Sequence, residues 1–209
     1  MKTLKKYLAI ATTFGVLTFA GSAFAQEAPD ALVQRISHEV LDTAKADKSI
    51  QGGNQQRIFS LVEEKIIPHV DFDRMTSLAA GRYWRDATPD QKKLLTAQFR
   101  SLLIYTYSGA LAQVRDQKID FKPMRGAPTD TDVEVRSQVI QPRGEPIQLN
   151  YRMEKLADGW KIYDVNVLGA WLVESYKGTF ASEIGRSGMD GLIKMLTDKN
   201  KTLATRGAK

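Results

Sequence analysis

Cysteine is absent from the 209-residue chain, and histidine occurs only twice. Without cysteine, the protein can form no disulfide and can carry no lipid anchor attached to cysteine. His38 and His69 fall on different predicted helices, and neither has other metal-binding residues near it at the spacing of a metal site. We therefore expect no metal site. GRSG at 185–188 is not G-x-S-x-G, and neither a P-loop nor G-x-G-x-x-G occurs. Hydrolase, nucleotide-binding and metal chemistry therefore lack their usual motifs.

Single acidic residues are the only other candidates for catalysis. Asp120, Asp164 or Glu174 could serve as a general base inside an apolar cone. The alternative function is therefore a small α+β enzyme of the isomerase type that acts on an apolar substrate. A lone acid is more often a solvated surface charge, so we expect no catalytic residues and a protein that is not an enzyme.

The first 25 residues have the pattern of a secretory signal peptide. Lys2, Lys5 and Lys6 precede an apolar run over 7–20, and SAFA at 22–25 offers a cleavage site after Ala25. We therefore expect a soluble, exported protein of residues 26–209, which suits a bacterial periplasm. Removal of the three lysines leaves 27 basic residues against 24 acids, a net charge of +3. This near balance gives little reason to expect binding to nucleic acid.

Four segments of the first half have helical periodicity. Apolar residues recur at helical spacing within 29–46, 54–68, 71–84 and 88–114. Asp71 is predicted to cap the third segment. Thr88, Pro89 and Gln91 form the pattern of a capping box at the start of the fourth.

The second half begins as sheet. Four strands are predicted at 118–124, 131–140, 145–156 and 159–168, with Gly, Pro and Asp turns between them. The middle two alternate apolar and polar residues, which is typical of an antiparallel sheet with one solvated face. The last strand changes phase between Ile162 and Tyr163, which predicts a bulge or burial on both faces. Two closing helices are expected at 169–182 and 187–199, so the chain is one α+β domain.

Two blocks of the sequence resemble the MlaC family, also called toluene-tolerance auxiliary proteins. DVNVLGAWLVESYKGTF at 164–180, followed by GMDGLIKMLTDKNK at 188–201, resembles the family's C-terminal signature. The block at 70–111 resembles its V-D-F, G-x-x-W, Q-x-x-x-F and L-L-x-x-T-Y pattern. Leu95 replaces the usual phenylalanine and Lys177 replaces the usual arginine, so the first position stays apolar and the second stays basic. Trp171 stands where a small residue is common and could reshape a cavity.

The resemblance implies a periplasmic phospholipid carrier that shuttles lipid between the outer and inner membranes and so maintains outer-membrane lipid asymmetry. It implies a curved four-stranded antiparallel sheet packed against helices, with an apolar cavity between them, and no cofactor besides the lipid cargo. The implied partners are an outer-membrane lipoprotein–porin complex and an inner-membrane ABC transporter with an MCE-domain subunit; a monomer is expected. We expect the acyl chains to contact apolar residues of the sheet and helices, namely Leu78, Trp84, Phe99, Leu103, Tyr107, Val133, Val135, Val139, Leu149, Tyr151, Met153, Val165, Val167, Leu172, Val173, Tyr176 and Phe180.

Overall fold

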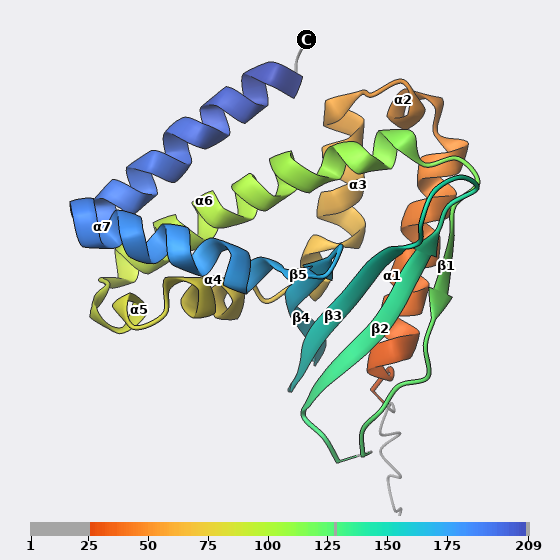
Figure 1. The fold of residues 1–209 in the computed structure, drawn as a ribbon, viewed down its shortest axis with the longest axis horizontal. Helices are drawn as coiled ribbons and strands as arrows, with labels where there is room; N and C mark the ends of the chain where they lie inside the picture. The colour runs from red at the N-terminus through yellow and green to blue at the C-terminus, as the bar shows by residue number, and fades with distance from the viewer. Residues whose placement is uncertain (1–25, 128, 208–209) are drawn as a thin grey trace, which may run out of the picture.

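The computed structural model describes residues 26–127 and 129–207, so the predicted signal peptide at 1–25 lies outside the described residues. Helices make up the first half, as the periodicity predicts (Figure 1). Their bounds are α1 Pro29–Ala46, α2 Lys48–Gln51, α3 Gln55–Lys65, η1 Ile67–His69, α4 Phe72–Ala80, α5 Tyr83–Asp86, α6 Pro89–Tyr107 and η2 Ser108–Gln113.

Side-chain caps fix where α4 and α6 begin. The Asp71 carboxylate accepts a hydrogen bond from the Arg74 amide at 2.8 Å. The Thr88 hydroxyl accepts one from the Gln91 amide at 3.2 Å, and the Gln91 side chain accepts one from the Thr88 amide at 3.0 Å. These three bonds satisfy backbone amides that the start of a helix leaves unpaired. The predicted cap at Asp71 and the predicted capping box at Thr88 are thus confirmed.

The sheet is antiparallel, in the order β1-β2-β3-β4-β5. Its strands are β1 Lys118–Phe121, β2 Asp132–Ile140, β3 Ile147–Leu156, β4 Gly159–Val167 and β5 Ala170–Trp171. The sequence predicts four strands, and the fifth replaces the expected first turn of the helix at 169–182. Leu168 and Gly169 have positive φ angles of 55° and 87° and reverse the chain, so Ala170 pairs with Val167.

A bulge in β4 explains the change of phase in its sequence. Arg152 pairs with Asp164, but the next residue, Met153, pairs with Ile162. Tyr163 is therefore an extra residue that has no partner of its own in β3. Because of it, Val165 lies on the same face of the sheet as Ile162. The predicted bulge is confirmed.

The two predicted closing helices form one element, α7 Leu172–Gly207, which bends at Gly188. Gly188 has a φ of 73°, a conformation that glycine adopts without a steric cost. Beyond the bend the helix runs back along α6, as Figure 1 shows. The Asn200 amide holds it there by donating to the backbone oxygen and the side-chain oxygen of Gln98, both at 2.9 Å.

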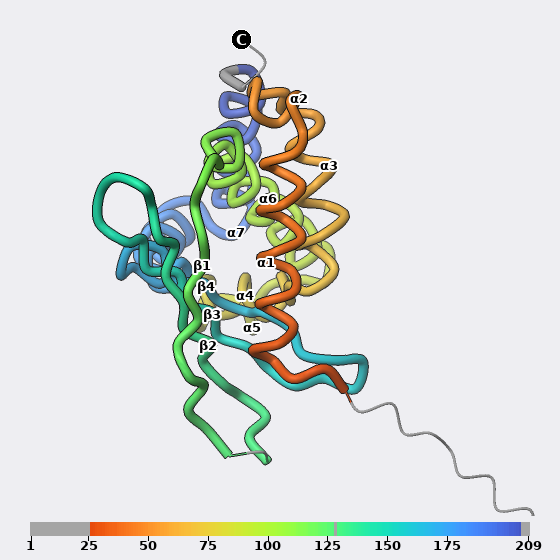
Figure 2. The backbone as a smooth tube through the Cα atoms, turned by 90° about the vertical axis from the view of Figure 1, so that its right-hand side faces the viewer, coloured from red at the N-terminus to blue at the C-terminus, as the bar shows by residue number. Residues whose placement is uncertain are grey.

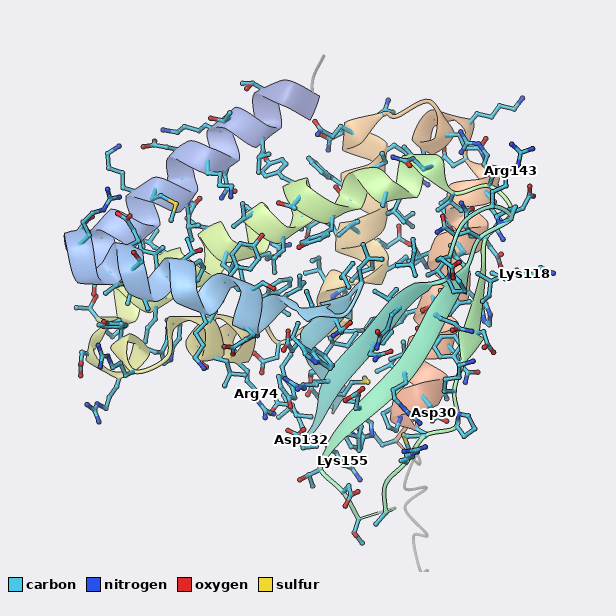
Figure 3. The ribbon with its side chains drawn as sticks, in the orientation of Figure 1. Asp30, Arg74, Lys118, Asp132, Arg143 and Lys155 are labelled. Atoms are coloured by element: carbon cyan, nitrogen blue, oxygen red, sulfur yellow. The ribbon has the colours of Figure 1, made fainter. Side chains whose placement is uncertain are left out.

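Two apolar clusters form the interior. The sheet cluster joins β2, β3 and β4 to α1 and α3, and Figure 2 shows α1 along one face of the sheet. The helix cluster joins α4, α6 and α7. Val70 and Val165 pack against both clusters. The opposite face of the sheet carries a polar network in which Arg74 pairs with Asp132 at 2.8 Å, visible in Figure 3.

Within the described part of the chain, no helix has both the length and the apolar character needed to cross a membrane.

Candidate functional site

The face of the sheet that packs against α1, here called the inner face, carries alternate residues of β2, β3 and β4. Side chains toward one end of this face are almost completely inaccessible; Val135 is 1% exposed and Met153 is 0% exposed. Leu32, Val33 and Ile36 of α1 belong to the same buried cluster. We call this region the buried half, and its residues are Val133, Val135, Tyr151, Met153, Trp160 and Ile162.

The other end of the inner face remains partly accessible. The pairing between neighbouring strands places its residues side by side in one apolar patch, because Val139 pairs with Ile147 and Leu149 pairs with Val167. All of them are intermediate in exposure, although they are aliphatic and lie on the same face as the buried half. We call this region the accessible half, and its residues are Val139, Ile147, Leu149, Val165 and Val167.

The difference in accessibility decides which residues a lipid can reach without rearrangement. An inaccessible side chain borders no void large enough for a water molecule, so an acyl chain could contact Met153 only after its neighbours move. Leu149 and Val167 already expose apolar surface. The accessible half is therefore the candidate lipid-contact site.

Buried aromatic rings occupy the middle of the helix cluster. Phe99 and Phe180 are both fully buried, and their ring centroids lie 5.0 Å apart in an edge-to-face arrangement. Tyr176 stacks edge-to-face on Phe99 at 5.0 Å but is only partly buried. Burial raises the pKa of Tyr176 to about 12. Tyr176 is thus one of the partly accessible side chains at the edge of the helix cluster.

The predicted lipid-contact residues are therefore not all brought together. Leu103, Leu172 and Val173 are buried in the helix cluster with the two phenylalanines. Leu78 and Tyr107 are exposed on the surface. Trp84 packs partly against the helix cluster and also lines a hollow of about 480 Å³ with Pro89, Lys92 and Lys93. The set predicted from the sequence is divided among the two halves of the inner face, the helix cluster and the surface.

Asp164 joins the start of α7 to the sheet. Its carboxylate, only 1% exposed, accepts hydrogen bonds from the amides of Val165 at 2.9 Å and Val173 at 3.0 Å. Burial raises the pKa of Asp164, and the two amide bonds partly oppose the shift. Arg152 pairs with the same carboxylate at 3.4 Å, and its guanidinium lies 3.9 Å from the centre of the Trp171 ring. Trp171 is thus part of a polar connection between sheet and helix.

The acids considered for general-base catalysis are engaged away from the accessible half. Asp120 pairs with Lys122 at 2.5 Å, which lowers the pKa of Asp120. Glu174 is exposed and pairs with Lys177 at 3.5 Å. Asp164 lies opposite Arg152 on the outer face; its Oδ1 accepts from the Val173 amide at the start of α7, and its Oδ2 pairs with Arg152. The described residues also contain no group of three or more metal-ligating side chains. The geometry therefore supports apolar binding better than general-base chemistry.

Sequence reasoning missed two features of this region. Ile147 belongs to the accessible half, and its alternation with Leu149 was a sufficient signal to include it. Leu168 was also missed, although it follows the apolar strand directly and precedes a turn glycine. It is 72% exposed, the largest value among the large exposed apolar side chains of the described chain.

Comparisons with known proteins agree on one family. The model of the MlaC protein family matches residues 34–198. The intermembrane phospholipid transport system binding protein MlaC of Haemophilus influenzae is 24% identical over 190 residues, which cover 86% of this chain and 89% of the relative. The toluene tolerance protein ttg2D of Pseudomonas putida is 27% identical over 184 residues, which cover 88% and 83%.

A solved structure extends the likeness to three dimensions. It is a phospholipid-binding protein from Ralstonia solanacearum in complex with a phospholipid. It is 48% identical to this chain with a TM-score of 0.81, and the match covers 86% of this chain and 99% of the other.

Proposed function

Because this chain belongs to the MlaC family, we propose that it is a phospholipid carrier rather than an enzyme. The observation that supports this function is the accessible half, a contiguous apolar patch on a sheet face that is otherwise closed by α1. The Ralstonia structure, 48% identical to this chain, holds a phospholipid. The expected cargo is thus a diacyl phospholipid whose acyl chains contact Leu149, Val167 and their neighbours.

The energetics of lipid transfer explain why such a protein needs apolar surface and no reactive group. Each buried methylene contributes about 0.8 kcal/mol, so the roughly 30 methylenes of a diacyl lipid would cost about 25 kcal/mol to expose to water. A carrier lowers this cost by offering comparable apolar burial. The accessible half supplies part of that surface in the described conformation.

We infer that the rest becomes available when the helices move. Phe99 and Phe180 are inaccessible and pack against each other, so acyl chains can reach them only if the helices of the helix cluster move away from one another and from the sheet. The two clusters meet at Val70 and Val165, and α7 is tied to β4 through Asp164. In the proposed loaded form, the acyl chains occupy the space between Val165 and the helices.

The proposed location is the periplasm, and the proposed route runs between two membrane complexes. The donor and acceptor are an outer-membrane lipoprotein–porin complex and an inner-membrane ABC transporter with an MCE-domain subunit, as in the family. A carrier must leave each complex after exchange. The near balance of basic and acidic residues in 26–209 suits weak, salt-sensitive contacts.

The test is native mass spectrometry of the purified protein, together with an organic extract of the same sample. We expect a mass shift of one phospholipid or more, and head groups in roughly the proportions of the host membrane. Folded protein recovered free of lipid after mild purification would contradict the carrier function. Turnover of an apolar substrate by the lipid-free protein would instead favour the enzyme.

A further inference from the structure

Leu168 combines two properties that are each unfavourable for stability. Its side chain is 72% exposed, so it gains little from the burial that normally stabilises leucine. Its φ of 55° makes it the one residue other than glycine with a positive φ among residues 26–127 and 129–207. A leucine in this left-handed region is strained because its Cβ crowds the backbone.

Other residues would fit the turn at position 168 with less strain than leucine. Leu168 and Gly169 form the two-residue connection between β4 and β5, and both have positive φ angles. Turns of this kind favour Asn-Gly or Asp-Gly, since asparagine and aspartate tolerate the left-handed region. Leucine therefore costs stability both by its conformation and by its exposure. Residues held under such strain on a protein surface point to a function.

The backbone holds this leucine at a defined place beside the candidate site. The Leu168 amide donates to the Gln148 oxygen at 3.1 Å, and the Gly169 amide donates to the Asn166 side chain at 3.0 Å. Val167, the residue before it, pairs with Leu149 in the accessible half. Leu168 therefore follows the last residue of the accessible half in the chain and places an exposed apolar side chain in the turn after it.

We propose that Leu168 is the residue that acyl chains contact first as they pass between a membrane and the accessible half. The inference rests on the proposed carrier function. A residue exposed to this degree adds little to the bound state, but it shields methylenes from water while they cross. Its loss should therefore slow exchange and leave the amount of bound lipid unchanged.

The test uses full-length mature protein and vesicles of phosphatidylethanolamine and phosphatidylglycerol that contain a self-quenched fluorescent phospholipid. For Leu168→Asn we expect the exchange rate to fall about tenfold, which corresponds to about 1.4 kcal/mol in the barrier. Bound lipid at equilibrium should match the wild type. The melting temperature should be equal or higher, because asparagine suits the turn.

Two further variants separate apolar contact from a merely structural role. Leu168→Met keeps an apolar side chain at this position and does not relieve the strain. This variant should therefore exchange lipid nearly as fast as the wild type. Leu94→Gln removes a leucine that is 51% exposed on α6, and it should leave the rate unchanged. Equal slowing by Leu94→Gln would overturn a specific role for Leu168.

The outcomes distinguish this inference from the carrier function. If the wild type holds lipid but Leu168→Asn exchanges it at the wild-type rate, the proposed contact is wrong and the carrier function stands. If the wild type holds lipid but exchanges none with vesicles, lipid does not pass directly between a membrane and this end of the protein, and the proposed contact is again wrong. If the wild type holds no lipid, the carrier function itself fails.

Discussion

The buried half and the accessible half of the inner face are both formed by apolar residues of the same three strands. Val135 and Val139 lie four residues apart on β2 and share a face, yet one is inaccessible and the other is partly exposed. The sheet cluster unites the first with α1, and the second is not buried in it. The comparison teaches that the helices, rather than the strand sequence, decide which part of the face is core and which part is free to bind.

The largest difference is expected from placing a carboxylate in each half. Val135→Glu buries an unpaired charge and should cost about 4 kcal/mol or more, enough to prevent stable folding. Val139→Glu can direct its charge to solvent, so the protein should fold but lose most of its bound lipid. Urea unfolding and lipid extraction would measure both. Unfolding of the two variants to the same degree would make the accessible half ordinary core.

Truncation on β3 sharpens the comparison with smaller changes. Met153→Ala leaves a cavity in the buried half and should lower the free energy of unfolding by about 2–5 kcal/mol. Leu149→Ala removes a side chain that is already partly exposed, and it should cost no more than about 1.5 kcal/mol. Measured on delipidated protein, the order of the two values is the test. Lipid content should fall for Leu149→Ala, whereas any folded Met153→Ala should keep it.

The connection between the two clusters can be weakened at Asp164. Asp164→Ala leaves the amides of Val165 and Val173 unpaired and removes the cap of α7, which should cost about 2 kcal/mol. Glu174→Ala, an exposed change in the first turn of the same helix, should stay within about 0.5 kcal/mol. If the clusters separate during loading, Asp164→Ala should also speed lipid exchange. An unchanged rate would argue against separation at this joint.

The smallest effect is expected in the pH dependence of stability. The pKa of Asp164 is raised above its ordinary value of 3.8, so over that window the native state binds more protons than the unfolded state. Its contribution is therefore fully present below the ordinary pKa and is lost as pH rises through the raised one. Relative to Asp164→Asn, the wild type should gain stability on acidification. Burial also raises the pKa of Glu154. Because Glu154 titrates in both proteins, its contribution to the pH dependence cancels in the difference.

Much of the fold could be predicted from local patterns. The alternation in β2 and β3 identified the inner face, because side chains of a strand alternate between faces. The capping residues located the start of α4 and α6, and the change of phase in β4 indicated its bulge. β5 could not be predicted, because a strand of two residues is too short to show the alternation of apolar and polar residues that identifies a strand. The bend at Gly188 was anticipated only as a break between two helices.

The candidate site could be predicted only as a list of inward apolar residues. Nothing in the sequence distinguishes Val135 from Val139, because their accessibility depends on where α1 lies. Phe99 and Phe180 were predicted as lipid contacts because the sequence does not show whether an apolar residue is accessible; in the structure they pack against each other. Leu168 was overlooked because exposure and a positive φ are properties of the folded turn.

The extra residue in β4 also governs how other sequences should be aligned with this one. If Tyr163 were absent, Val165 and Val167 would turn outward, and Asp164 and Asn166 would face the apolar interior. An alignment gap placed two positions away would assign the two residues between it and Tyr163 to the wrong face, while hardly altering the identity score. When relatives of different length are compared, the gap belongs between Ile162 and Asp164.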